Sequence, residues 1–129
     1  MPRSDPPQNE RLAERIPVVW PVDCATEETF LFAALTNISA LGIFVRTDEP
    51  LPVGTLVRLR FAPPSYISEP FAMRGRVQWV NRITMFGENL NPGMGIRFLD
   101  LQPEDRERLV AAIRTIAYLR RDPADLATN

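Results

Sequence analysis

The sequence predicts an all-β fold, a six-stranded antiparallel β-barrel with one C-terminal α-helix. Six short runs alternate between apolar and other residues with a period of two, and Gly, Pro and Asn separate them. One later segment repeats its apolar residues at helical spacing. The 129 residues, 45% of them hydrophobic, suffice for a single core. Six strands in so small a domain favour a closed barrel, because closure leaves no strand edge exposed.

The strands are expected at residues 16–24, 30–36, 43–45, 55–62, 71–79 and 94–99. The first contains Pro17 and Pro21, which cannot donate to a ladder, so it is either an edge strand or its backbone N positions there face away from a partner strand. In the fifth, Trp79 shares a face with Val77 and is expected in the core rather than as a platform for a ligand. Cys24 is expected as a small buried apolar residue.

A helix is expected from Pro103, which suits the first helical turn, as do Glu104 and Asp105 at the positive end of the helix dipole. The apolar face of this helix consists of Leu109, Ile113 and Ile116, with Val110 and Ala117 beside them. Arg120 and Arg121 follow at its negative end. The apolar face requires a partner, either the mouth of the barrel or a second subunit in a homodimer.

The two ends of the chain lack apolar periodicity. Residues 1–10 are polar and contain three prolines, which predicts a flexible N-terminal arm. Residues 11–118 then form the folded domain, and residues 119–129 form a tail. The N-terminal segment is unlike a signal peptide, and no apolar run approaches the ~18 residues of a membrane-spanning helix. The expectation is a cytoplasmic protein without membrane insertion.

The composition argues against most enzymes. All 15 basic residues are arginines, and 16 acidic residues bring the net charge to −1, so a general nucleic-acid binder is not expected. There is no His, the usual general base and commonest metal ligand. The single Cys allows neither an internal disulfide nor a Cys-cluster zinc site. We expect no metal, no cofactor and no catalytic site, which leaves a binding module.

Two short motifs contain the residue types of a binding site. Arg11 and Arg15 lie four residues apart before the first strand, and Asn37, Ser39 and Gly42 lie at the turn between the second and third strands. A guanidinium offers a planar fork to phosphate or to the O6/N7 edge of guanine. Asn and Ser bind base edges or phosphate oxygens, and Gly permits a close backbone approach or a positive φ. The set suits a phosphorylated ligand that bears a base.

Hairpin geometry brings the two motifs together. A turn is expected near Thr26, between the first and second strands. Residues equally far from the turn lie opposite each other in an antiparallel hairpin. Arg15 and Asn37 are each eleven residues from Thr26, so we expect them side by side.

The pattern RxxxR at residues 11–15, followed by NxSxxG at residues 37–42, resembles the paired motif of PilZ domains, which are receptors for the bacterial second messenger cyclic di-GMP. The resemblance extends over residues 11–118. Later family strands and the family's C-terminal helix resemble residues 51–57, 75–80, 93–98 and 102–109. The resemblance implies a six-stranded barrel capped by a helix.

The resemblance also implies roles for the motif residues. Arg11 and Arg15 would grip the phosphates and guanines of cyclic di-GMP, and Asn37, Ser39 and Gly42 would hold a guanine and a phosphate on the barrel surface. The segment that carries the arginines would close over the ligand. The expected function is a cyclic di-GMP receptor whose N-terminal arm changes conformation and signals to an unidentified protein partner.

Glu10 and Glu14 occupy positions where extra arginines often flank the family motif, and their carboxylates oppose an anionic ligand. They also offer partners to Arg11 and Arg15 on a simple solvated helical turn. Some PilZ-like proteins bind no nucleotide. The alternative function is therefore a nucleotide-independent adaptor in motility or type IV pilus regulation.

A second basic feature comprises four arginines that point outward from the fourth and fifth strands, namely Arg58, Arg60, Arg74 and Arg76. We expect Arg58 opposite Arg76 and Arg60 opposite Arg74. Like charges on neighbouring strands are unfavourable unless acids or a partner neutralise them. Either helix acids such as Glu104 and Glu107 balance this face, or it docks an acidic protein or nucleic acid.

Overall fold

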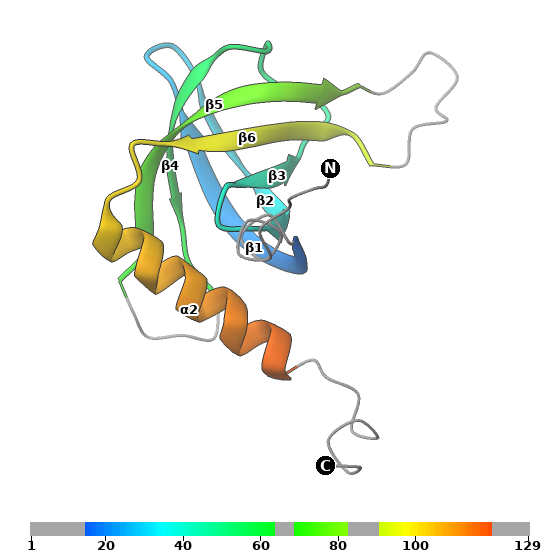
Figure 1. The fold of residues 1–129 in the computed structure, drawn as a ribbon. Coiled ribbons are helices and arrows are strands. Elements are labelled where there is room, and N and C mark those ends of the chain that lie inside the picture. Colours follow the sequence, from blue (N-terminus) through cyan, green and yellow to red (C-terminus); the bar gives the residue numbers. More distant parts are fainter. Residues whose placement is uncertain (1–14, 64–68, 83–90, 120–129) are drawn as a thin grey trace, which may run out of the picture.

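The computed structural model describes residues 15–63, 69–82 and 91–119. They form a closed antiparallel barrel in the order β1-β2-β3-β6-β5-β4 with one helix after it, so the predicted fold class is confirmed (Figure 1). The elements are β1 (Ile16–Ala25), β2 (Phe30–Ile38), β3 (Gly42–Arg46), β4 (Leu56–Phe61), β5 (Phe71–Asn81), β6 (Gly93–Leu99) and α2 (Pro103–Leu119). The predicted arm at residues 1–10 and tail residues 120–129 lie outside the described residues.

Alternating side chains from every strand fill the barrel. An aromatic layer crosses this core, because the ring of Phe61 lies 6.3 Å from Trp20, 5.4 Å from Phe71 and 6.2 Å from Phe98 between centroids. Each such pair adds about 0.5–1.5 kcal/mol to the stabilisation from burial alone. Cys24 is fully buried within the same core, as predicted.

The helix α2 lies along one end of the barrel (Figure 1). The face that it turns to the core contains Leu109, Ala112, Ile113 and Ile116. The barrel is therefore the apolar partner that the sequence required. Arg108 links the helix to β5 and to the segment before it. Its guanidinium lies 4.3 Å from the centroid of the Phe71 ring and donates to the carbonyl oxygen of Glu69 at 2.6 Å. No helix in the described part of the chain is long and apolar enough to span a membrane.

The two prolines of β1 precede the described pairing of this strand with β4. β1 pairs with β2 from Ile16 to Ala25, but its pairing with β4 begins only at Val22. Pro17 and Pro21 both precede that point. Among the described residues, Pro17 and Pro21 thus lie outside the ladder between β1 and β4, which agrees with the rarity of proline within a fully paired strand.

The predicted register of β4 and β5 is wrong by two residues. Arg58 lies opposite Arg74, and Leu56 lies opposite Arg76. The innermost pair of this hairpin is Phe61 with Phe71, whose stacked rings in the core fix the register.

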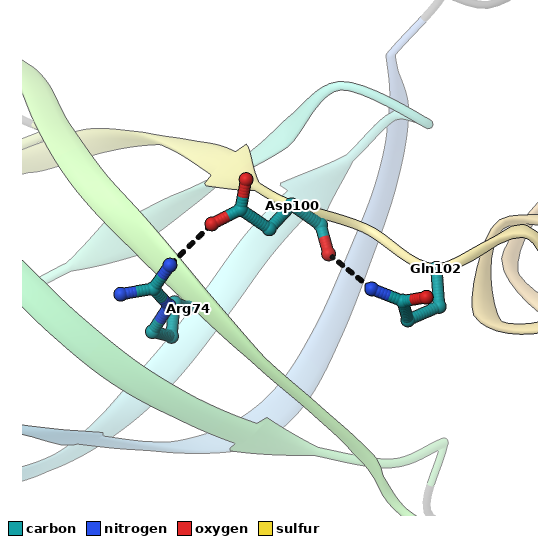
Figure 2. A network of polar contacts seen from close by, with 3 residues as sticks. All are labelled: Arg74, Asp100 and Gln102. Carbon is teal, nitrogen blue, oxygen red and sulfur yellow. Dashed lines mark hydrogen bonds and ion pairs between the residues drawn. The ribbon is translucent and has the colours of Figure 1, made fainter.

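The acid that pairs with an arginine of this face is not on the helix. Arg74 forms an ion pair with Asp100, which follows β6, and Gln102 donates to the Asp100 carbonyl at 3.4 Å (Figure 2). Asp100 has a left-handed backbone with a φ of 52°. This conformation turns the chain from β6 toward α2. Among the described residues, the ion pair on this face therefore comes from the segment between β6 and α2, and neither Glu104 nor Glu107 forms one with these arginines.

Candidate functional site

The two motifs meet at the start of β1. Arg15 directly precedes β1, and its Nη1 donates to Oδ1 of Asn37 on β2 at 2.7 Å. The predicted contact is confirmed, although Asn37 pairs through its backbone with Pro17 rather than with Arg15. The turn is centred later than expected, because Thr26 begins it: the Thr26 hydroxyl accepts from the N–H of Thr29 at 2.9 Å. The long arginine side chain spans the offset.

Ser39 is built into the turn that follows β2. Its side chain is buried, with 1% of its surface exposed, and its Oγ accepts from the N–H of Leu41 at 3.1 Å. Its own N–H donates to the carbonyl of Gly42 at 2.9 Å. Because the hydroxyl oxygen accepts one bond, its hydrogen remains able to donate to an oxygen atom of a ligand.

Gly42 is required by a close approach between strands. A Cβ atom at this position would lie 2.2 Å from the backbone oxygen of Ile96 on β6. Among the described glycines, Gly54 has a positive φ and Gly42 does not. Of the two reasons that the sequence offered for Gly42, close approach is the one that applies.

A surface cavity of about 320 Å³ lies beside these residues. Its wall includes Arg15, Ser39 and Gly42 of the predicted site together with Gln78, Trp79 and Arg97. Asn37 adjoins it through the bond to Arg15. Arg11, the remaining predicted site residue, lies outside the described residues.

The prediction that Trp79 lies in the core is wrong. A register shift between Val77 and Trp79 interrupts the pairing of β5 with β6, so Val77 points inward while 46% of Trp79 is exposed. The indole stacks on Phe44 at 5.3 Å between centroids. It also covers Gly95, where a Cβ atom would lie 2.3 Å from the indole Nε1. A half-exposed indole in the cavity wall can stack on a nucleic-acid base.

The cavity suits an anion. Arg15 and Arg97 line it, and no carboxylate is among the described residues that line it. These residues also include no imidazole or thiol that would exchange a proton. In the described ranges, no group of three or more His, Cys, Asp or Glu residues is placed to hold a metal ion. The geometry provides hydrogen-bond donors, an aromatic face and positive charge.

The fold and cavity together define a small β-barrel module with a basic hollow on its outer surface. The chain belongs to the PilZ domain family, whose pattern matches residues 9–115. A comparison with curated protein sequences found no match.

Solved structures share the fold at low sequence identity. YcgR from Escherichia coli in complex with c-di-GMP is 19% identical with a TM-score of 0.71, over 88% of this chain and 49% of that one. The motility inhibitor MotI/DgrA from Bacillus subtilis is 20% identical with a TM-score of 0.68, over 83% and 50%. The isolated PilZ domain of YcgR with c-di-GMP is 18% identical with a TM-score of 0.66, over 87% and 95%. The chain spans about half the length of the first two proteins.

Proposed function

We propose that this protein is a receptor for cyclic di-GMP, which binds in the cavity beside Arg15. The observation that carries the proposal is the hydrogen bond between Arg15 and Asn37, which joins the two motifs at the edge of a hollow lined by no described carboxylate. Membership of the PilZ domain family supports it, as does the shared fold with YcgR, which was solved with c-di-GMP.

Each described motif residue has a distinct role in the proposal. The remaining N–H groups of Arg15 bind a phosphate or the O6/N7 edge of a guanine. Asn37 accepts from Arg15 through its oxygen, so its amide N–H groups are left for a base edge. The Ser39 hydroxyl donates to a phosphate oxygen, while Gly42 keeps β3 close to β6. Trp79 stacks on a guanine.

The proposal extends to the N-terminal segment. Arg11 belongs to the same motif as Arg15, and Arg15 directly precedes β1. A ligand held by both arginines would therefore fix the chain that precedes the barrel. We propose that residues 1–10 change conformation on binding and that the altered surface signals to a protein partner, with residues 11–118 acting as the folded unit.

Calorimetric titration of the full chain with cyclic di-GMP tests the proposal. Loss of one charge-assisted hydrogen bond of ~1.5–3 kcal/mol should weaken binding by about tenfold to a hundredfold in Arg15→Ala. Arg15→Lys should lose nearly as much, because lysine lacks the planar fork. Arg106→Ala on the exposed face of α2 removes the same charge away from the cavity and should bind normally. The absence of heat at high ligand concentration from folded wild-type protein would refute the proposal.

A second candidate is a nucleotide-independent adaptor in motility or type IV pilus regulation. The observation that favours it is the exposed apolar surface on the outer face of β2, where 65% of Phe30 and 70% of Phe32 are exposed. Exposed aromatic residues on a sheet mark protein contacts. The adaptor should keep its effect on motility in Arg15→Ala and lose it in Phe32→Ser, whereas the receptor should lose it in Arg15→Ala.

A further inference from the structure

Two arginines lie directly opposite each other on the outer face of neighbouring strands beside the cavity. Arg76 on β5 is the register partner of Arg97 on β6, and both side chains are exposed. Arg97 has Gly42 of β3 as its partner on the other side. Gly42, Arg97 and Arg76 therefore lie side by side on β3, β6 and β5. Gly42 belongs to the predicted NxSxxG motif, so the arginine pair adjoins that motif.

The face has a second pair of directly opposed arginines, Arg58 and Arg74, whose side chains have partners within the fold, whereas Arg60 lies opposite the acidic residue Asp23. Arg74 is neutralised by Asp100 (Figure 2), and Arg58 donates to the carbonyl of Thr26 at 3.5 Å. In the part of the chain that the structure describes, no ion pair or hydrogen bond of the Arg76 or Arg97 side chain is found. Like charges directly opposite each other on adjacent strands destabilise the fold. Of the two directly opposed arginine pairs, the one in which neither side chain has a described partner is thus Arg76 with Arg97, beside the cavity.

The register shift after Val77 shapes the space around this pair. It turns both Gln78 and Trp79 outward, so the indole of Trp79 covers Gly95. Gly42 carries no side chain, and the hollow lies between it, the indole and Arg97. Arg97 lines this hollow together with Arg15. Arg76 is not a lining residue and lies opposite Arg97 on the neighbouring strand.

We propose that Arg76 and Arg97 form a second anion-binding subsite, which takes a phosphodiester group beyond the one held at Arg15. The inference rests on the proposed function, since it assigns a further contact to the same nucleotide. Two neighbouring guanidinium groups suit the oxygen atoms of a phosphodiester, and the bound anion relieves the repulsion between them. The phosphodiester belongs either to the molecule held by Arg15 or to a second copy beside it.

The test is calorimetric titration of the full chain with cyclic di-GMP, combined with thermal unfolding of the ligand-free protein. Arg76→Gln and Arg97→Gln should each weaken binding by about tenfold, the effect of one lost charge-assisted bond. Their ligand-free melting temperatures should equal or exceed that of the wild type, because one of two opposed charges is gone. Arg58→Gln is the matched control, with the same charge change on the same face, and should bind as the wild type does.

Each outcome decides the inference. If the wild type binds and both glutamine variants bind equally well, the subsite is refuted while the receptor function stands. If Arg58→Gln weakens binding as much as Arg76→Gln, the effect is one of general charge and the subsite is again refuted. If the folded wild type does not bind, the receptor function itself fails.

A fall in the stoichiometry of cyclic di-GMP binding in the glutamine variants assigns the phosphodiester to a second ligand copy, and a fall in affinity alone assigns it to the first. Arg76→Lys, which keeps the charge without the fork, should bind more weakly than the wild type and serves if the glutamine variants do not fold.

Discussion

The substitution Gly42→Ala should destabilise the barrel through a backbone clash at the candidate site. The new Cβ would lie 2.2 Å from the carbonyl oxygen of Ile96. An ordinary contact between these atom types is about 3.3–3.6 Å, so the two strands must separate by roughly 1 Å. The obstructing atom belongs to the backbone of β6, and no side-chain rotation relieves the contact.

The expected cost follows from that geometry. Forced overpacking costs about 1–3 kcal/mol, and each weakened ladder hydrogen bond adds about 1 kcal/mol. We therefore expect Gly42→Ala to lower the free energy of unfolding by ~2–4 kcal/mol, a large part of the ~5–15 kcal/mol typical of a domain. The barrel closes through the pairing of β3 with β6, so the loss should appear in global unfolding.

Urea denaturation followed by circular dichroism measures this loss, with Gly54→Ala as the control. Gly54 has a φ of 95° and no atom within 4 Å of an added Cβ, so alanine there costs only the left-handed conformation, about 1–2 kcal/mol. Gly42→Ala should be clearly the more damaging of the two. An equal or smaller loss would refute the view that close approach of β3 and β6 is the reason for this glycine.

Three further predictions concern other parts of the barrel. Gly95→Ala places a Cβ 2.3 Å from the indole Nε1 of Trp79, so the indole should swing outward and its fluorescence emission should shift to the red. Burial, with a smaller contribution from the charge of Asp23, raises the pKa of Cys24 to about 12 from 9.0. The thiol of the unfolded chain therefore loses its proton at a lower pH than the thiol of the folded chain. The free energy of unfolding should then fall between pH 9.0 and about 12. The Cys24→Ala variant should show a smaller fall. Arg108→Ala removes a cation–π contact and a bond to a carbonyl oxygen, and should cost about 1–2 kcal/mol in urea denaturation.

The sequence was sufficient for the fold class because burial sets the alternation in most strands. In β4, Val57, Leu59 and Phe61 are buried while the residues between them are exposed, as the period of two predicts. The spacing of Leu109, Ile113 and Ile116 likewise predicted the face of α2 that meets the core. Hydrophobic burial acts on every residue of an element, so its pattern survives local irregularities.

Alternation alone did not identify the inward face of β2. Both faces of this strand carry apolar residues, since Phe30 and Phe32 alternate with Leu31 and Ala33. In the barrel, Leu31 and Ala33 pack against the core and the two phenylalanines are exposed. Where both faces are apolar, the choice depends on pairing with neighbouring strands, which a single strand sequence does not contain.

The contact between the two motifs was predictable from the sequence, whereas the wall of the cavity was not. Hairpin geometry placed Arg15 near Asn37 despite an error in the turn centre, because an arginine side chain spans such an offset. Trp79 and Arg97 were missed as lining residues. Placing Trp79 requires knowing where the pairing of β5 with β6 slips, and placing Arg97 requires the pairing of β3 with β6, which are distant in sequence.

Three register shifts of this barrel lie on β1, β2 and β5, and the one on β5 shapes the wall of the cavity. Pairing is irregular between Pro17 and Trp20 of β1, between Leu35 and Asn37 of β2, and between Val77 and Trp79 of β5. Uninterrupted alternation would turn Trp79 inward with Val77 and leave its side of the cavity without a wall. Bulges redirect side chains in this way and are frequent beside binding sites. The shift in β5, which sequence periodicity does not reveal, is therefore the feature that places Trp79 in the wall of the candidate site.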